Sequence, residues 1–215
     1  MLCCSSNIFL ERAALYCIQM ALNEFRTRSV KRSSMSNREK ILWITRKAVF
    51  IAVLVVLQAV TKPLGQYVTG SLVNLVLVLS VMLGGLWCGA TVALLSPVFA
   101  LLVGIGPAFP PLLPFIMLGN LTLVLVWHLL AGKAEAKTLV TRSLVATAVA
   151  ALAKFTVLYL GIVQLAIPYI LQLEPQQVIV LSASFSFPQL ITALFGGLVA
   201  SAVLPTLRKA LRLPA

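Results

Sequence analysis

The chain has 215 residues, of which 60% are hydrophobic and only 10% are charged, and its mean hydropathy is +1.04. A soluble domain carries about 25% charged residues, so this composition excludes an ordinary soluble fold. The formal net charge of +12 does not indicate nucleic-acid binding, because the basic residues bracket apolar segments and do not form a basic face interleaved with aromatic residues. We therefore expect an all-α integral membrane protein.

Hydropathy predicts a compact bundle of six membrane spans, since roughly 20 apolar residues cross the hydrocarbon core of a bilayer. The second and third spans form one long apolar run that Gly84-Gly85 interrupts. This run is short for two full spans, which leaves a five-span alternative open. The six predicted spans cover residues 44–61, 69–84, 86–105, 112–131, 143–171 and 186–205.

The N-terminal residues are predicted to lie outside the membrane domain. Residues 1–40 contain no uninterrupted apolar core, so we expect a disordered cytoplasmic extension followed by a single membrane domain over residues 41–212. Met35 begins Met-Ser-Asn-Arg-Glu-Lys, which is typical of a natural start. The four cysteines show no paired spacing, so neither a disulfide framework nor a metal site is predicted.

The basic residues predict the orientation, because loops rich in Lys and Arg stay in the cytoplasm. They gather before the first span, between the fourth and fifth spans, and in the C-terminal tail. The opposite loops carry only Lys62 and Glu174. Both termini are therefore predicted to be cytoplasmic, which requires an even number of spans and favours six over five.

The sequence offers few residues from which a catalytic site could be built. All five acidic residues lie outside the predicted spans, and the single histidine, His128, sits near the cytoplasmic end of the fourth span. A carboxylate relay for proton-coupled transport is disfavoured for the same reason, and no phosphate-binding loop for ATP is present. We predict no catalytic residue, no cofactor and no bound metal, so uphill transport by this chain would need energy from another subunit.

Five isolated polar residues are predicted to converge in the outer half of the membrane. At 1.5 Å per residue, the fourth and fifth spans place their amides within about 10 Å of the outer surface. Two interpretations stay open: the set lines a pocket open to the outside, or the amides satisfy one another between helices. The set consists of Lys62, Asn74, Asn120, Gln164 and Gln189.

Lys154 is the strongest single signal, because it lies about 12 residues beyond Arg142 and so roughly 18 Å into the membrane. A lysine at that depth is costly and is expected to face the bundle interior with a partner. The partner is either an anionic ligand or a set of backbone carbonyls, amides or water. The residues that share its helical face are small or weakly polar, as an interior surface requires: Thr147, Ala150, Ala151 and Gly161.

Two spans carry stripes of small residues, which let membrane helices approach closely. In the first span, Ala48, Ala52 and Ala59 fall within about 40° of one face, and the stripe serves either a partner protein or packing within the chain. In the sixth span the stripe is predicted to serve packing within the chain; it consists of Ala193, Gly196, Gly197, Ala200 and Ser201.

Several of these features occur together in one known family. Arg46-Lys47 leads into Ala48-Val49-Phe50-Ile51-Ala52, and the segment from Thr61 to Gly70 follows the first span. Over residues 38–212 the chain resembles the S component, the substrate-binding membrane subunit, of an energy-coupling factor (ECF) transporter. The Ala-x-x-x-Ala element is similar to the family's docking motif, and the segment from Thr61 to Gly70 resembles the first loop that closes its pocket.

The resemblance implies a function and a set of partners. The protein would bind one micronutrient, a vitamin or a precursor, and Lys62 and Lys154 favour an anionic one. It would dock through Ala48 and Ala52 on a membrane-embedded T protein coupled to two cytoplasmic ATPases in a prokaryotic cell membrane, and then release the substrate inside. The candidate ligand contacts are Lys62, Asn74, Asn120, Lys154, Gln164 and Gln189.

Other functions remain as alternatives. A self-sufficient small transporter would need two similar halves or a polar path across the whole bundle, and neither is evident in the sequence. An accessory membrane protein without a ligand is a further alternative. The sequence does not define the substrate.

Overall fold

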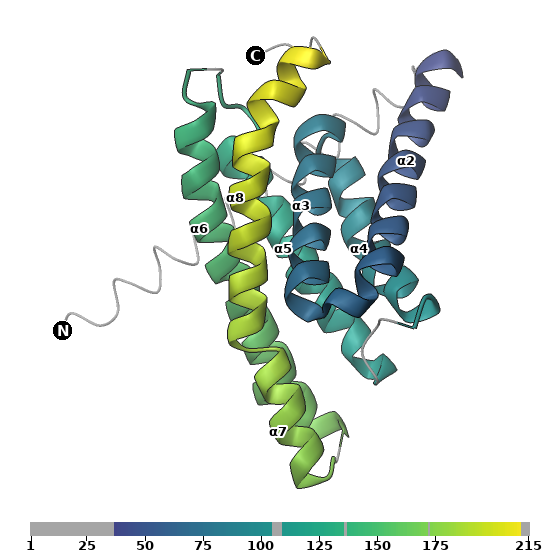
Figure 1. Cartoon of the computed structure of the whole chain (residues 1–215), viewed down its shortest axis with the longest axis vertical. Coiled ribbons are helices and arrows are strands. Elements are labelled where there is room, and N and C mark those ends of the chain that lie inside the picture. The colour runs from purple at the N-terminus through teal and green to yellow at the C-terminus, as the bar shows by residue number, and fades with distance from the viewer. Residues whose placement is uncertain (1–36, 105–108, 136, 172, 212–215) are drawn as a thin grey trace, which may run out of the picture. The chain divides into compact units, whose positions relative to one another are not determined.

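The computed structural model describes residues 37–104, 109–135, 137–171 and 173–211, and every regular element in these ranges is helical (Figure 1). The chain divides into two compact units, residues 1–44 and residues 45–215, and the description below concerns the second. The α-helices are α2 (Asn37–Thr61), α3 (Gln66–Gly84), α4 (Leu86–Leu102), α5 (Leu113–Ala131), α6 (Leu139–Leu158), α7 (Pro175–Ser184) and α8 (Phe187–Ala210). Three shorter elements join them: the 3₁₀ turns η1 (Lys62–Leu64) and η2 (Pro110–Leu112), and the π-helical segment η3 (Tyr159–Leu171).

Five helices form a closed ring in the order α3, α8, α6, α5 and α4, with α4 packed back on α3. Figure 1 shows α8 between α6 and α3. The centre of the ring is filled by branched and aromatic side chains such as Leu77, Val92, Val124 and Trp127, all of which are buried. From Thr45 onward, α2 makes few close backbone contacts with the ring and reaches its core through larger side chains, of which Leu54 is buried.

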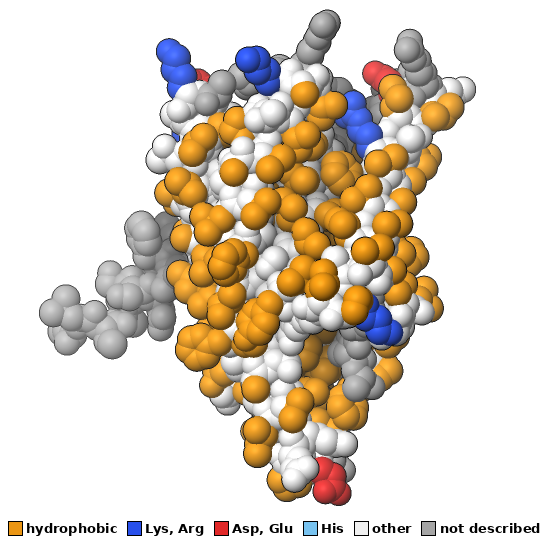
Figure 2. Space-filling model, viewed as in Figure 1, with side chains coloured by type: hydrophobic (Ala, Val, Ile, Leu, Met, Phe, Trp, Pro, Cys, Tyr) orange, Lys and Arg blue, Asp and Glu red, His pale blue; other side chains and the backbone are white. Residues whose placement is uncertain are grey.

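Five of the apolar segments are long enough to cross a membrane, which is compatible with a multi-pass membrane protein. They are Glu39–Leu64, Gln66–Gly84, Pro110–Ala131, Leu139–Leu171 and Pro175–Ala210. The remaining apolar helix, α4, has 17 residues and is shorter than these five. Large apolar side chains cover the middle of the face seen in Figure 2, as expected for a surface that contacts lipid.

The break predicted at Gly84-Gly85 is confirmed, because α3 ends at Gly84 and α4 begins at Leu86. Gly85 has φ +81°, a left-handed backbone conformation that side chains with a Cβ rarely adopt. Its amide still bonds to Val81 O at the end of α3, and its carbonyl accepts from Cys88 N at 3.0 Å in the first turn of α4. One glycine therefore both ends α3 and starts α4.

Two connections differ from the sequence-based expectation. The segment from Thr61 to Gly70 is not a loop: Thr61 ends α2, η1 turns the chain, and α3 begins at Gln66. The connection before the last span contains the helix α7, whose first turn begins at Pro175, a residue already restricted to the helical φ. Residues 37–40 of the predicted extension are the first turn of α2, and the rest of that extension lies outside the described residues.

The small-residue stripe of the last span packs within the chain, as predicted, and all five of its residues are buried. A Cβ on Gly196 would lie 2.6 Å from Ser71 O and 2.7 Å from the Cβ of Asn74, so α8 touches the backbone of α3 here. A Cβ on Gly197 would lie 2.6 Å from a methyl carbon of Thr147 on α6. The stripe therefore lets α8 pack tightly against both of its neighbours in the ring.

We predict that Gly196→Val destabilises the protein by about 1–3 kcal/mol, because the added carbons have no room between α8 and the α3 backbone. Thermal unfolding of the purified chain in detergent would measure the loss. The matched control is Ala202→Val, since Ala202 is exposed on the same helix and gains the same kind of side chain. Equal unfolding temperatures for the two variants would contradict the packing described here.

Candidate functional site

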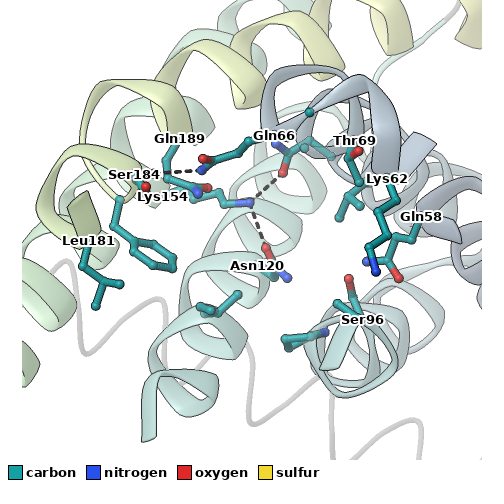
Figure 3. Close-up of a pocket in the computed structure, with 18 residues that line it drawn as sticks. Gln58, Lys62, Gln66, Thr69, Ser96, Asn120, Lys154, Leu181, Ser184 and Gln189 are labelled. Atoms are coloured by element: carbon teal, nitrogen blue, oxygen red, sulfur yellow. Dashed lines mark hydrogen bonds between the residues drawn. The ribbon is translucent and has the colours of Figure 1, made fainter. Parts of the chain in front are cut away.

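The side chain of Lys154 lies inside the ring and is only 3% exposed. Its ammonium group donates to Asn74 Oδ1 on α3 at 2.6 Å and to Asn120 Oδ1 on α5 at 2.8 Å (Figure 3). A charge held away from water must be hydrogen-bonded to be tolerated, and two amide oxygens meet part of that need. One side chain thus joins α6 to α3 and α5.

A second layer of hydrogen bonds continues from Asn74. Its amide nitrogen donates to Thr192 Oγ1 on α8 at 3.4 Å, and the Thr192 hydroxyl donates to Gln189 O at 3.2 Å. Because the amide oxygen faces Lys154 while the amide nitrogen faces Thr192, the orientation of Asn74 is defined from both sides. The polar network therefore spans four helices of the ring.

The charge of Lys154 is not balanced by a carboxylate in the described part of the chain. The acidic residues there are Glu39, Glu135 and Glu174, and all three are exposed. An ammonium group has three N–H donors, and the two asparagines take two of them. One donor, and the positive charge itself, are thus available to a further partner.

A pocket of about 430 Å³ opens beside Lys154. Polar groups line it on two sides, as Figure 3 shows, and apolar side chains such as Val73, Pro97, Ile116 and Phe185 also contribute to its lining. This size and this mixture of apolar walls with a few polar groups are typical of small-molecule sites. The pocket therefore has room for a ligand next to the buried charge.

On the far side of the pocket lies a second cluster of polar side chains, which come from α2, η1 and α4. Figure 3 shows Gln58, Lys62 and Ser96 together, apart from Lys154 and Asn120. Gln58 is 3% exposed and Ser96 is 2% exposed, whereas Lys62 is exposed. The Lys62 ammonium lies near Gly104, just beyond the end of α4, where helix carbonyls favour a positive charge.

Two sets of hydrogen bonds hold the mouth of the pocket. Gln66 Nε2 at the start of α3 donates to Ser184 O at the end of α7 at 2.9 Å, across the pocket from one helix to another (Figure 3). Thr69 Oγ1 donates to Thr61 O at 2.9 Å and so secures the η1 turn. The start of α3 and the end of α7 thus meet beside the pocket.

The structure brings together five of the six predicted ligand contacts. Lys62, Asn74, Asn120, Lys154 and Gln189 all line the pocket. The exception is Gln164, which does not line the pocket. Its side chain is exposed on η3 and donates to the hydroxyl of Tyr159 at 3.2 Å.

The predicted docking residues have a different environment from the ligand contacts. Ala48 and Ala52 are exposed, and so is Ala59 on the same stripe. Within residues 45–61 of α2, the core is instead contacted by larger side chains such as Leu54 and Phe50. The stripe of α2 is therefore not used for packing among the described residues, in contrast to the stripe of α8.

Several lining residues were not predicted from the sequence. Gln58 lies four residues before Lys62, and an α-helix continued through both residues would place them on one face, so this spacing was a usable signal. Gln66 and Ser184 give no such signal in the sequence, because their hydrogen bond joins two residues that come together only in the folded chain. The lining residues that were missed include Gln58, Gln66, Thr69, Ser96 and Ser184.

The pocket and the basic end of the molecule lie at opposite ends of the ring. Gln189 lines the pocket near the start of α8, and Arg208 follows roughly 28 Å further along that helix. There Arg208 donates to Ala134 O at 3.2 Å, beside the connection that carries Lys133 and Lys137. The site is thus remote from the basic loops.

Comparisons with protein-family models, with curated proteins and with solved structures found no match to this chain. In the described part of the chain, fold and site together define a helical bundle with five segments long and apolar enough to cross a membrane, and a pocket that mixes polar and apolar lining residues. Its function is therefore argued from the residues of this pocket.

We predict that Asn120→Leu destabilises the protein by about 2–3 kcal/mol, because the buried ammonium loses one of its two oxygen partners. In a Lys154→Met background the same substitution should cost much less, since no charge remains to be satisfied. Unfolding measurements on the four proteins of this double-mutant cycle give the coupling directly. Additive effects would show that the bond between Lys154 and Asn120 contributes nothing to stability.

Proposed function

We propose that this chain is the substrate-binding S component of an ECF-type transporter and binds a small organic anion for uptake. The observation that carries the proposal is Lys154: its buried ammonium borders a 430 Å³ pocket and has one donor not taken by its asparagine partners. A central lysine costs about 3 kcal/mol to insert, and an ionisable residue inside a membrane segment generally marks a functional site. A bound anion offsets that cost.

The polar lining supports a carboxylate or phosphate near Lys154. Asn74 and Asn120 offer amide oxygens to the ammonium, and these neutral groups leave the net charge in place. An anionic oxygen at the third donor makes a charge-assisted hydrogen bond, which is stronger than a neutral one. Ligand binding is thus favoured by both charge and geometry.

The proposed topology has six crossings with both termini in the cytoplasm. The sixth crossing is α4, whose 17 residues extend about 25 Å and fall at the short end of the range for membrane helices. The basic residues between α5 and α6 and at the end of α8 then lie inside, in line with the usual charge bias. The pocket, at the other end of the ring, opens toward the outside of a prokaryotic cell.

The proposed energy source is a separate complex, and this chain is not itself an enzyme. Its docking face is the exposed alanine stripe of α2, with Ala48 and Ala52 at the centre of the contact. Small residues let a partner helix approach closely in lipid. The partner is a membrane-embedded T protein that carries two cytoplasmic ATPases, and ATP hydrolysis there drives release of the substrate inside.

We predict that the wild-type protein, purified in detergent from its native cells, retains a small molecule that Lys154→Met loses. Native mass spectrometry would detect the molecule as an added mass on the intact chain. The substitution removes the charge but keeps an unbranched side chain of similar length, so the fold is preserved better than with alanine. Lys137→Met, which changes an exposed lysine outside the pocket, should retain the added mass.

An empty wild-type protein that also fails to purify with a T protein and its ATPases would contradict the proposed function. It would then favour an accessory membrane protein. Retention of the same molecule by Lys154→Met would place its binding elsewhere.

We predict that the double substitution Ala48→Leu and Ala52→Leu abolishes co-purification with the ATPase complex and leaves ligand retention unchanged. Two bulky side chains would hold a partner helix away from α2 at the point of contact. Affinity purification of the tagged chain from its native cells, followed by protein mass spectrometry, measures the association. Ala148→Leu, at an exposed position on α6, is the control. Unchanged recovery of the complex with the double variant would exclude the α2 stripe as the docking face.

A further inference from the structure

Gln58 contains a buried acceptor without a partner. Its Oε1 atom makes no hydrogen bond to any described residue, although the side chain is only 3% exposed. One other side-chain atom in the described part of the chain shares this state, the hydroxyl oxygen of Ser143, and that residue does not line the pocket. An unsatisfied carbonyl oxygen is unfavourable inside a protein, so its presence at the wall of a pocket calls for an external donor.

The position of Gln58 complements that of Lys154. The two residues lie on different sides of the pocket, as Figure 3 shows, and apolar side chains such as Pro97 and Ile116 also line it. The Lys154 ammonium has a remaining N–H donor and a positive charge, so it favours an anionic acceptor. The Gln58 carbonyl oxygen is an acceptor, so it favours an N–H or O–H donor. A ligand that satisfies both sides is therefore polar at its two ends, and the rest of it contacts the apolar part of the lining.

We infer that Gln58 is a specificity-determining contact, and that the pocket selects small organic anions carrying an N–H or O–H donor at the end opposite the anionic group. This inference rests on the proposed function and deepens it, since it names the class of substrate. The anionic group accepts from Lys154, the body packs against the apolar walls, and the distal donor bonds to Gln58 Oε1. Ser96, buried beside Gln58, offers a hydroxyl to the same end of the ligand.

Discrimination by such a contact is expected to be strong. A site with a buried acceptor rejects an analogue that lacks the donor, because the acceptor then stays unsatisfied in the complex. Replacing the hydrogen of an N–H by a methyl group has a second effect, since the methyl occupies the space of the hydrogen bond. A matched pair of probes that differ only in this group isolates the contribution of Gln58.

The experiment uses two such pairs on the full chain in detergent: indole-3-acetate with 1-methylindole-3-acetate, and indole-3-propionate with its 1-methyl analogue. The two chain lengths allow for the separation between Lys154 and Gln58. Apparent dissociation constants come from the rise in unfolding temperature with probe concentration. For at least one pair, the N–H member should bind the wild-type protein about tenfold more tightly than its methylated partner.

The variants assign that preference to Gln58. In Gln58→Met the preference should disappear, and in Lys154→Met both members of the pair should lose binding. Gln176→Met, at an exposed position on α7 outside the pocket, should retain the full preference. Without any probe, Gln58→Met should unfold at a higher temperature than wild type, because the substitution removes an unsatisfied acceptor. A glutamine with a structural role would give the opposite shift.

Three results would overturn the inference. They are equal binding of both members of each pair to wild type, an N–H preference that persists in Gln58→Met, and binding of none of the four probes. These failures are separate from a failure of the proposed function, which depends on the molecule retained from cells. If a retained ligand is lost in Lys154→Met while the paired probes bind equally, the proposed binding function stands. The role of Gln58 in substrate specificity is then excluded.

Discussion

The hydrogen bonds from Lys154 to the oxygens of Asn74 and Asn120 are the interaction on which the interior of this protein depends. A lysine ammonium in a low-dielectric interior is strongly unfavourable unless oxygen atoms replace its water shell. Here the two oxygens come from two other helices, so burial of the charge requires α3, α5 and α6 to meet at one depth. The same group that constrains the ring also borders the pocket, so the packing of the ring and the proposed binding site depend on one residue.

Short asparagine side chains reach this lysine only because the helices that carry them pack closely. On α5, a Cβ at Gly119 would lie 2.8 Å from Leu158 of α6, directly beside Asn120. On α8, Gly196 touches the backbone of α3 beside Asn74 and brings Thr192 within reach of the Asn74 amide. Glycine therefore acts indirectly in the site, since it sets the distances over which the polar groups interact.

The sequence predicted the burial of Lys154 but not the directions of the other polar side chains. A lysine inside an apolar span was expected to face the bundle interior, and Lys154 is buried there; its partner stayed open, because rotation about the helix axis depends on tertiary packing. Gln164 has a suitable depth and a different direction: η3 is π-helical, with bonds from residue i to i+5, so a face cannot be extrapolated from the α-helical period. The helix α7 was missed because its ten residues carry too few apolar groups to resemble a span.

The described part of the chain holds a buried cation with no buried anion, and this asymmetry has a consequence for transport. A ligand that neutralises Lys154 lowers the electrostatic cost of the interior, so the loaded and empty proteins differ in stability by the differential affinity of the site. The mouth is held by the hydrogen bond from Gln66 to Ser184 O, a neutral bond between the start of α3 and the end of α7, both of which contribute to the pocket wall. In the proposed transporter, tight binding inside and weak closure at the rim are compatible only if release is driven by another subunit. A pocket beside a buried lysine, together with an exposed small-residue face on α2, therefore supports the proposed binding subunit more than a self-sufficient pump.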